Sequence, residues 1–213
     1  MDLDPTMLTL QEQDDLLATL RKYQHLIPKS SRDYVEGRTM YIGVLDIGLT
    51  KITREIAEIA QTLNNCLRSH VPSFRWTTIV INWNTRSRKH VDGKNDGSSF
   101  ILSLGNHTGG GLRLYESTDY PDKPTKILTI HGRFTEFNGR IPHDNAPYEG
   151  ERFSIIFFVH RAFRRFSGVV EKNTLESLLP SASRGPRPPG SPARSRTRTP
   201  TPSPCSWRSR GAA

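Results

Sequence analysis

Two stretches of the sequence decide the fold: HVDGKNDGSSFILSLGNHTGGGLRLYE at residues 90–116 and FTEFNGRIPHDNAPYEGERFSIIFFVH at residues 134–160. Both consist of short runs rich in β-branched and aromatic residues, which are typical of strands. Glycine, asparagine, aspartate and proline separate these runs, as in turns. The same pattern begins at Trp76, and no helical segments alternate with the runs. We therefore expect an antiparallel sandwich or barrel in this part of the chain.

The residues before this region predict helices. Apolar residues recur at helical spacing over residues 8–26, and TLQE at residues 9–12 has the pattern of a capping box. A strand is expected over Thr39–Ile47. A longer amphipathic helix follows, with Thr50 as its candidate N-cap and an apolar stripe over residues 52–67. Helices followed by many short strands predict the α+β class, with the helices covering one face of a sheet.

The length of 213 residues suits one domain and a tail, and is too short for two full domains. Most of the net charge of +9 lies at the C-terminus, because residues 181–213 hold seven arginines and no acidic residue. The Pro/Ser/Arg-rich segment 173–213 is expected to be disordered, since it has almost no large apolar side chains to offset its chain entropy. We divide the chain into an N-terminal helical segment (1–36), a strand-rich domain (37–172) and this basic tail (173–213).

The sequence also bears on the compartment. Its acidic N-terminal residues predict no secretory signal, and no stretch approaches the roughly 18 apolar residues of a membrane span. The two cysteines, Cys66 and Cys205, form neither a CxxC motif nor a disulfide framework. These features predict a reducing, intracellular environment without membrane contact.

Three motifs in the strand-rich region suit the binding of a metal and a dicarboxylic acid. His90 and Asp92 are two residues apart at the end of a strand and so point to the same side, and His143 can join them from a distant strand. Two histidines and one carboxylate are the facial ligand set of non-haem Fe(II), which leaves three positions open. Arg152, with Ser154 two residues later, can hold a carboxylate at a fixed distance from the metal.

With these motifs, residues 76–162 resemble the Fe(II)/2-oxoglutarate-dependent dioxygenases. They are most similar to the branch of the TET and base-J-synthesising enzymes, which oxidise the 5-methyl group of pyrimidines in DNA. The resemblance implies a double-stranded β-helix, or jelly roll, in which His90, Asp92 and His143 bind Fe(II). It makes Arg152 the anchor of the co-substrate 2-oxoglutarate, with Ser154 assisting, and O₂ the second co-substrate. The expected substrate is 5-methylcytosine or thymine in DNA, with RNA less favoured, and a nuclear location follows from it.

Five residues near the proposed metal site are candidate substrate contacts. Asn95 completes an HxDxxN motif and, by the resemblance, can contact the base, but an ordinary turn residue in the polar GKNDG loop is an equally good interpretation. A basic cluster around His90 suits phosphate contacts, although a solvated run of charge is the default expectation. The basic residues are Arg86, Arg88, Lys89 and Lys94.

Other histidines and a glycine run have competing interpretations. His107, His131 and His160 are alternative metal ligands, but His131 lacks a carboxylate at short spacing and is interpreted as structural. The run at residues 109–111 resembles a phosphate-binding loop without the Gly-Lys-Ser/Thr that such a loop requires. We expect it to let the backbone pass close to the metal site.

Two other functions stay open. One keeps the iron chemistry and makes the substrate a protein side chain, as in prolyl or lysyl hydroxylases. The other is a non-catalytic jelly-roll module that binds nucleic acid or protein through the arginine-rich tail. The segment SRTRTPTPSP at residues 195–204 also suits phosphorylation or a protein contact. The sequence carries no signal for an oligomeric state.

Overall fold

The structure, a computed structural model, describes residues 4–116 and 122–166, so the predicted tail at 173–213 lies outside the described residues. The helical elements are α1 (Leu10–Lys22), η1 (Gln24–Leu26), α2 (Arg54–His70) and η2 (Arg161–Phe166). The strands are β1 (Val35–Leu45), β2 (Gly48–Leu49), β3 (Thr78–Ser87), β4 (Asn95–Leu104), β5 (His107–Gly109), β6 (Leu112–Leu114), β7 (Lys126–Leu128), β8 (Thr135–Phe137), β9 (His143–Asn145), β10 (Tyr148–Gly150) and β11 (Phe153–His160).

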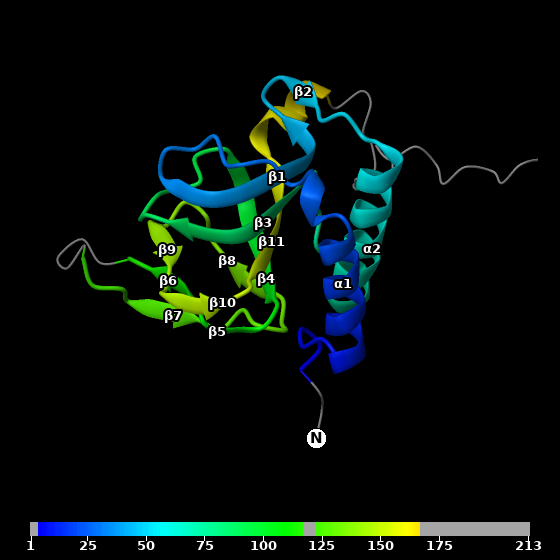
Figure 1. The fold of residues 1–213 in the computed structure, drawn as a ribbon. Helices are drawn as coiled ribbons and strands as arrows, with labels where there is room; N and C mark the ends of the chain where they lie inside the picture. The colour runs from blue at the N-terminus through cyan, green and yellow to red at the C-terminus, as the bar shows by residue number, and fades with distance from the viewer. Residues whose placement is uncertain (1–3, 117–121, 167–213) are drawn as a thin grey trace, which may run out of the picture. The chain divides into compact units, whose positions relative to one another are not determined.

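One large antiparallel sheet has the strand order β2-β1-β3-β11-β4-β8. Its last strand in the sequence, β11, lies between β3 and β4, so both of its edges are paired. This central position explains why β11 carries the apolar run IIFFV. Two smaller sheets, β7-β6-β9 and β10-β5, form the second layer of strands (Figure 1).

The outer face of the large sheet packs against α1 and α2, which stand side by side in Figure 1. Because side chains alternate along a strand, Ile155 and Phe157 of β11 face the helices, whereas Ser154 and Ile156 face the other way. The large apolar core therefore lies outside the strand layers. Its members include Leu16, Leu20, Ile42, Ile59, Leu63, Leu67, Ile79, Ile81, Leu102 and Phe153.

The inner face of the large sheet is less apolar. A smaller hydrophobic cluster joins Ile101 of β4 to Leu112 and Leu114 of β6 and to Leu128 at the end of β7. Polar side chains such as Asn82 and Ser154 are buried beside it. This division leaves the space between the two strand layers free for a site.

The helix predictions hold in outline. The predicted helix at residues 8–26 is α1 followed by η1, and the capping box is present: the Thr9 hydroxyl accepts from the Glu12 N–H, and the Glu12 side chain accepts from the Thr9 N–H. The predicted N-cap of the second helix is wrong. Thr53 caps α2, since its hydroxyl accepts from the Ile56 N–H at 3.3 Å, whereas the Thr50 hydroxyl accepts from the Gly43 N–H at 2.8 Å.

The strand predictions hold for the long strands and for the short strands β6, β7 and β8, which lie in the β-rich runs at residues 111–116, 126–132 and 134–139. The strand β1 begins at Val35, earlier than the predicted start at Thr39, and ends at Leu45. The strands β5, β9 and β10 have three residues each and were not predicted. Among the described residues, no helix has the length and apolar character needed to cross a bilayer.

Candidate metal centre

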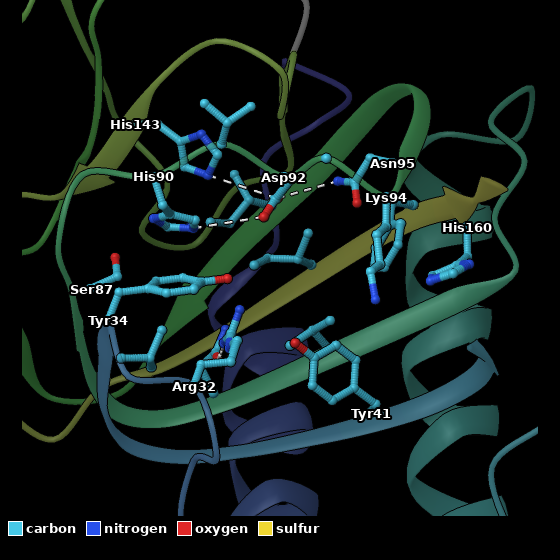
Figure 2. A pocket seen from close by; sticks show the side chains of 18 of the residues that line it. Arg32, Tyr34, Tyr41, Ser87, His90, Asp92, Lys94, Asn95, His143 and His160 are labelled. Carbon is cyan, nitrogen blue, oxygen red and sulfur yellow. Dashed lines mark hydrogen bonds and ion pairs between the residues drawn. The ribbon is translucent and has the colours of Figure 1, made fainter. Parts of the chain in front are cut away.

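The three predicted metal ligands converge at the junction of the two strand layers (Figure 2). His90 Nε2 lies 3.7 Å from Asp92 Oδ1, and His143 Nε2 lies 3.7 Å from Asp92 Oδ2. All three ligand atoms fit within 4.8 Å of one another. Ligands of one octahedral ion lie about 3–4 Å apart when each bond is about 2.1 Å long. The residues present therefore fit a divalent metal, and over 4–116 and 122–166 no other group of His, Cys, Asp or Glu does so.

Backbone hydrogen bonds bring these ligands together across 53 positions of sequence. The His90 N–H donates to the His143 carbonyl at 3.0 Å, and the His143 N–H donates back to the His90 carbonyl at 2.9 Å. The Asp92 N–H donates to the Gly139 carbonyl at 2.8 Å. The extended backbone after β3 is thus joined to β9 and to the turn before it.

A main-chain carbonyl two residues earlier in the chain orients each imidazole. His90 Nδ1 donates to the Arg88 carbonyl at 2.8 Å, and His143 Nδ1 donates to the Ile141 carbonyl at 2.7 Å. A carbonyl can only accept, so each Nδ1 carries the hydrogen and each Nε2 keeps its lone pair for a metal. Burial, and then the neighbouring His143, lower the pKa of His90, which favours the neutral form that ligates a metal.

Asn95 supports the carboxylate of this set. Its Nδ2 donates to Asp92 Oδ2 at 3.3 Å and to Ser99 Oγ at 3.0 Å, and the residue is only 4% exposed. Gly139 packs against the same pair, since a Cβ atom there would lie 2.9 Å from Asn95 Nδ2 and 3.0 Å from Asp92 Cβ. The structure therefore uses the Asn95 amide to hold Asp92, and a base contact by this residue stays a prediction.

Arg152, the predicted co-substrate anchor, is fully buried. Its Nη2 donates to the Gly110 carbonyl at 3.1 Å, and its guanidinium lies 5.2 Å from the Tyr148 ring centroid. Its Nε and Nη1 have no hydrogen-bond partner, and burial lowers the pKa of Arg152 to about 10. A buried guanidinium with two unused donors suits a carboxylate, which would accept from both.

Other unpartnered polar atoms lie near this arginine. Ser103, which pairs in register with Ser154, has an unpartnered buried hydroxyl. Both ring nitrogens of His107 are also buried without a partner. Burial, then His131, then Arg152 lower the pKa of His107 to about 4, so this ring is neutral at neutral pH. Buried groups of this kind normally have partners, and a dicarboxylate such as 2-oxoglutarate fits the set.

A cavity of about 740 Å³ lies between the strand layers and includes the three metal ligands in its wall. That volume accommodates a small dicarboxylic acid and part of a second molecule. Ser154 lines the cavity, and its hydroxyl accepts from Asn82 Nδ2 at 3.4 Å. Arg152 is not among the lining residues, so its role and that of Ser154 toward 2-oxoglutarate stay predictions.

The four basic residues of the predicted cluster do not line one common cavity. Lys94 lines the cavity and forms an ion pair with Asp46. Arg86 borders a separate hollow beside Tyr148, and Arg88 and Lys89 line neither. All four basic side chains are exposed.

Arg32, Tyr34 and Tyr41 are among the cavity residues that the sequence did not predict. The Tyr34 ring lies 4.7 Å from the His90 ring, centroid to centroid. The only signal was an arginine and a tyrosine two positions apart just before a predicted strand, a spacing that places both on one face.

The alternative histidines and the glycine run have other partners. His107 stacks on His131 at 4.3 Å, and His160 Nε2 lies 3.9 Å from Asp46, so none of the three joins the metal group. A Cβ atom at Gly110 would lie 2.9 Å from Arg152 Nε. The backbone of the glycine run thus passes close to Arg152, and its expected approach to the metal stays a prediction.

No known family model matches the chain, and no curated protein does either. Among solved structures, the chain is similar to NgTET1 in complex with 5mC DNA, with 16% identity and a TM-score of 0.51, covering 72% of this chain and 69% of that one. It is also similar to a prolyl hydroxylase from Trichoplax adhaerens in complex with a peptide fragment of the hypoxia-inducible factor oxygen degradation domain. That match has 17% identity and a TM-score of 0.52, and it covers 76% of this chain and 84% of that one.

These likenesses show that the chain shares the fold of NgTET1 and of this prolyl hydroxylase. The predicted α+β jelly roll is confirmed. Within this fold the site holds two histidines and one aspartate with their ligand atoms turned to one point, a set that suits Fe(II).

Proposed function

We propose that this protein is an Fe(II)- and 2-oxoglutarate-dependent dioxygenase that oxidises the 5-methyl group of a pyrimidine in DNA. The observation that carries the proposal is the group His90, Asp92 and His143, whose Nε2 and carboxylate atoms meet in the wall of a large cavity. Iron with 2-oxoglutarate and O₂, when bound there, supplies an oxidant able to attack an unreactive C–H bond.

The side chains and backbone of this chain would orient the metal ligands and bind the co-substrate. Asn95 fixes the Asp92 carboxylate, and backbone carbonyls fix both imidazoles, so the ligand set is held ready for the metal. Arg152 supplies two unused N–H donors for a distal carboxylate. The apolar residues Ile101 and Leu112 line the same cavity and exclude water from the reacting atoms.

A flipped pyrimidine is the substrate that the cavity supports best. A base inside a duplex is out of reach of a buried metal, so it must leave the stack and enter a pocket with a surface on which it can lie. Tyr34 beside His90 and Tyr41 farther along provide aromatic surface in the cavity. The structure of NgTET1 in complex with 5mC DNA has the same fold and supports this substrate class.

The test is nucleoside mass spectrometry on duplexes containing cytosine, 5-methylcytosine or thymine, after incubation with Fe(II), 2-oxoglutarate and O₂. We expect one added oxygen on a methylated pyrimidine with the wild type, and none with His143→Ala. His25→Ala is the matched control, because His25 is exposed on η1 and lies outside the cavity. Succinate formation without any change in a nucleoside would contradict the DNA substrate and leave the iron chemistry in place.

Hydroxylation of a protein side chain is the second candidate. The prolyl hydroxylase from Trichoplax adhaerens, solved in complex with a peptide, supports it because the two chains share a fold. Incubation with a library of proline- and lysine-containing peptides distinguishes the two. A gain of one oxygen on a peptide and on no nucleoside would favour this candidate.

A further inference from the structure

One wall of the cavity carries an arginine between two tyrosines. Arg32 lies on the segment that leads into β1, and its guanidinium carbon is 5.6 Å from the Tyr34 ring centroid and 5.7 Å from that of Tyr41. Figure 2 shows Arg32 pointing into the cavity, across from His143 and Asp92. A planar guanidinium between two aromatic rings is held in one orientation, so its N–H donors have a fixed direction.

The hydrogen bonding of Arg32 is incomplete. Its Nε is buried and has no partner, and its Nη2 makes only long contacts of 3.4 Å, to Thr39 Oγ1 and Asn82 Oδ1. In the part of the chain that the structure describes, no carboxylate forms an ion pair with Arg32. A cation that lines a cavity, with donors to spare, is placed to bind a group with two adjacent acceptors.

The chemistry of a pyrimidine identifies that group. The carbon that bears the 5-methyl group is para to the C2 carbonyl, so a base whose methyl group faces the metal ligands presents O2 to the opposite wall. In cytosine the neighbouring N3 is also an acceptor, whereas in thymine N3 carries a hydrogen and donates. A guanidinium has only donors, so it can make two parallel hydrogen bonds to cytosine but meets a donor at N3 of thymine.

We propose that Arg32 contacts the O2 and N3 edge of the flipped base and makes this cavity select 5-methylcytosine over thymine. The inference rests on the proposed function. Tyr34 and Tyr41 orient the guanidinium, whose Nη2 also donates to Thr39 and Asn82.

The experiment compares two duplexes that differ only in one base pair, 5-methylcytosine with guanine or thymine with adenine. The full chain is tested as wild type, Arg32→Lys and Arg32→Gln. Arg38→Lys is the matched control, since Arg38 is exposed on β1, donates to the Ile27 carbonyl and does not line the cavity. Binding is measured by fluorescence anisotropy with Mn(II) in place of iron, and turnover by kcat/KM for base oxidation, with succinate formation recorded in parallel.

The wild type is expected to prefer 5-methylcytosine over thymine by about tenfold or more in both binding and kcat/KM, which is the discrimination that one bidentate contact to a base gives. Arg32→Lys keeps the charge and can reach O2 of either base, so the preference falls to about twofold or less. Arg32→Gln, which can both donate and accept, loses the preference too. Arg38→Lys keeps it, and the KM for 2-oxoglutarate changes less than about twofold in every variant.

Three outcomes would overturn the inference, and they differ from one another. If the wild type and both Arg32 variants show the same ratio of activity on 5-methylcytosine to activity on thymine, Arg32 does not recognise the base, and the proposed function is unaffected. A rise in the KM for 2-oxoglutarate that matches the loss on DNA makes Arg32 a contact of the co-substrate. If the wild type oxidises no nucleoside, both the proposed function and this inference are wrong.

Discussion

Arg152 is a cation enclosed by protein with two of its nitrogens unpartnered, so it destabilises the chain until an acceptor reaches it. Burial lowers its pKa to about 10 from the ordinary 12.5, which means that the folded protein releases the proton more readily than the unfolded chain. The loss of folding free energy caused by this buried charge is therefore complete below about pH 10, and it becomes smaller as the pH rises above that value. At neutral pH the buried charge therefore destabilises the fold by its full amount.

Arg152→Met is accordingly expected to stabilise the protein without ligand by about 1–3 kcal/mol, because an apolar side chain replaces an unpaired buried charge. In the wild type, 2-oxoglutarate at 100 times its Kd is expected to raise the free energy of unfolding by about 2.7 kcal/mol, and the Tm with it. The substitution should abolish this rise. Thermal unfolding with and without 2-oxoglutarate measures both. A less stable Arg152→Met protein that still responds to 2-oxoglutarate would contradict this role.

Asn95 provides a second prediction about a single residue. Since its amide holds Asp92, Asn95→Ala should weaken metal binding by about 10- to 100-fold with no DNA present. Titration with Mn(II) measures this, and Asn106→Ala, an exposed asparagine in a turn, is the control. Unchanged metal affinity together with impaired DNA oxidation would instead favour the base contact.

The residues that sequence could predict are those whose chemistry is local. His90, Asp92 and His143 belong to short motifs in a fixed order, so their types and spacing were sufficient to group them. Arg32 has no such motif. It belongs to the site only because antiparallel pairing places β1 beside β3, and that placement depends on contacts far apart in the sequence.

The turn between β8 and β9 acts as a unit with the metal ligands. Gly139 passes so close to Asp92 and Asn95 that a methyl group has no room, whereas a Cβ atom at Gly93, the neighbour of Asp92, meets nothing within 4 Å. Gly139→Ala should therefore lower metal affinity by about tenfold or more by displacing Asp92. Gly93→Ala should leave it unchanged. Equal effects of the two substitutions in an Mn(II) titration would rule out this packing argument.

The elements that could be predicted are those that show a period or lie in a longer β-rich run. The helix α2 and the strand β11 have enough residues to show a period, and both were predicted. The strands β6, β7 and β8 have only three residues each, but they lie in longer β-rich runs that were predicted. The strands β5, β9 and β10 are equally short and lie in polar segments rich in glycine and proline, where no such run is present. Thr50 and Thr53 are equally good caps by residue type, and their hydrogen bonds distinguish them: the Thr53 hydroxyl accepts from the Ile56 N–H, and the Thr50 hydroxyl accepts from the Gly43 N–H.

At the scale of the whole molecule, the large sheet separates stability from chemistry. Its outer face packs on the helices in the main apolar core, and its inner face carries buried polar side chains around the cavity. Changes on the inner face therefore alter binding with little effect on the main core. This separation is why one fold accommodates different substrates, and why the fold alone does not identify the substrate.

The charge of the whole chain gives a further prediction. Replacing the seven tail arginines by glutamine in the full-length chain should lower the affinity for unmodified duplex DNA. The slope of log K against log salt should fall by up to about 6, since each phosphate contact contributes about 0.9. Metal affinity should not change. Fluorescence anisotropy over a salt series measures the slope, and an unaltered slope would remove the tail from DNA binding. The positions are Arg184, Arg187, Arg194, Arg196, Arg198, Arg208 and Arg210.

The carbonyls that orient His90 and His143 belong to the main chain, two residues before each ring. Almost any amino acid at position 88 or 141 presents the same oxygen, so the direction of both imidazoles is insensitive to the side chains there. Substitutions at these two positions can therefore accumulate without turning either ring, because the path of the backbone sets the direction of both imidazoles.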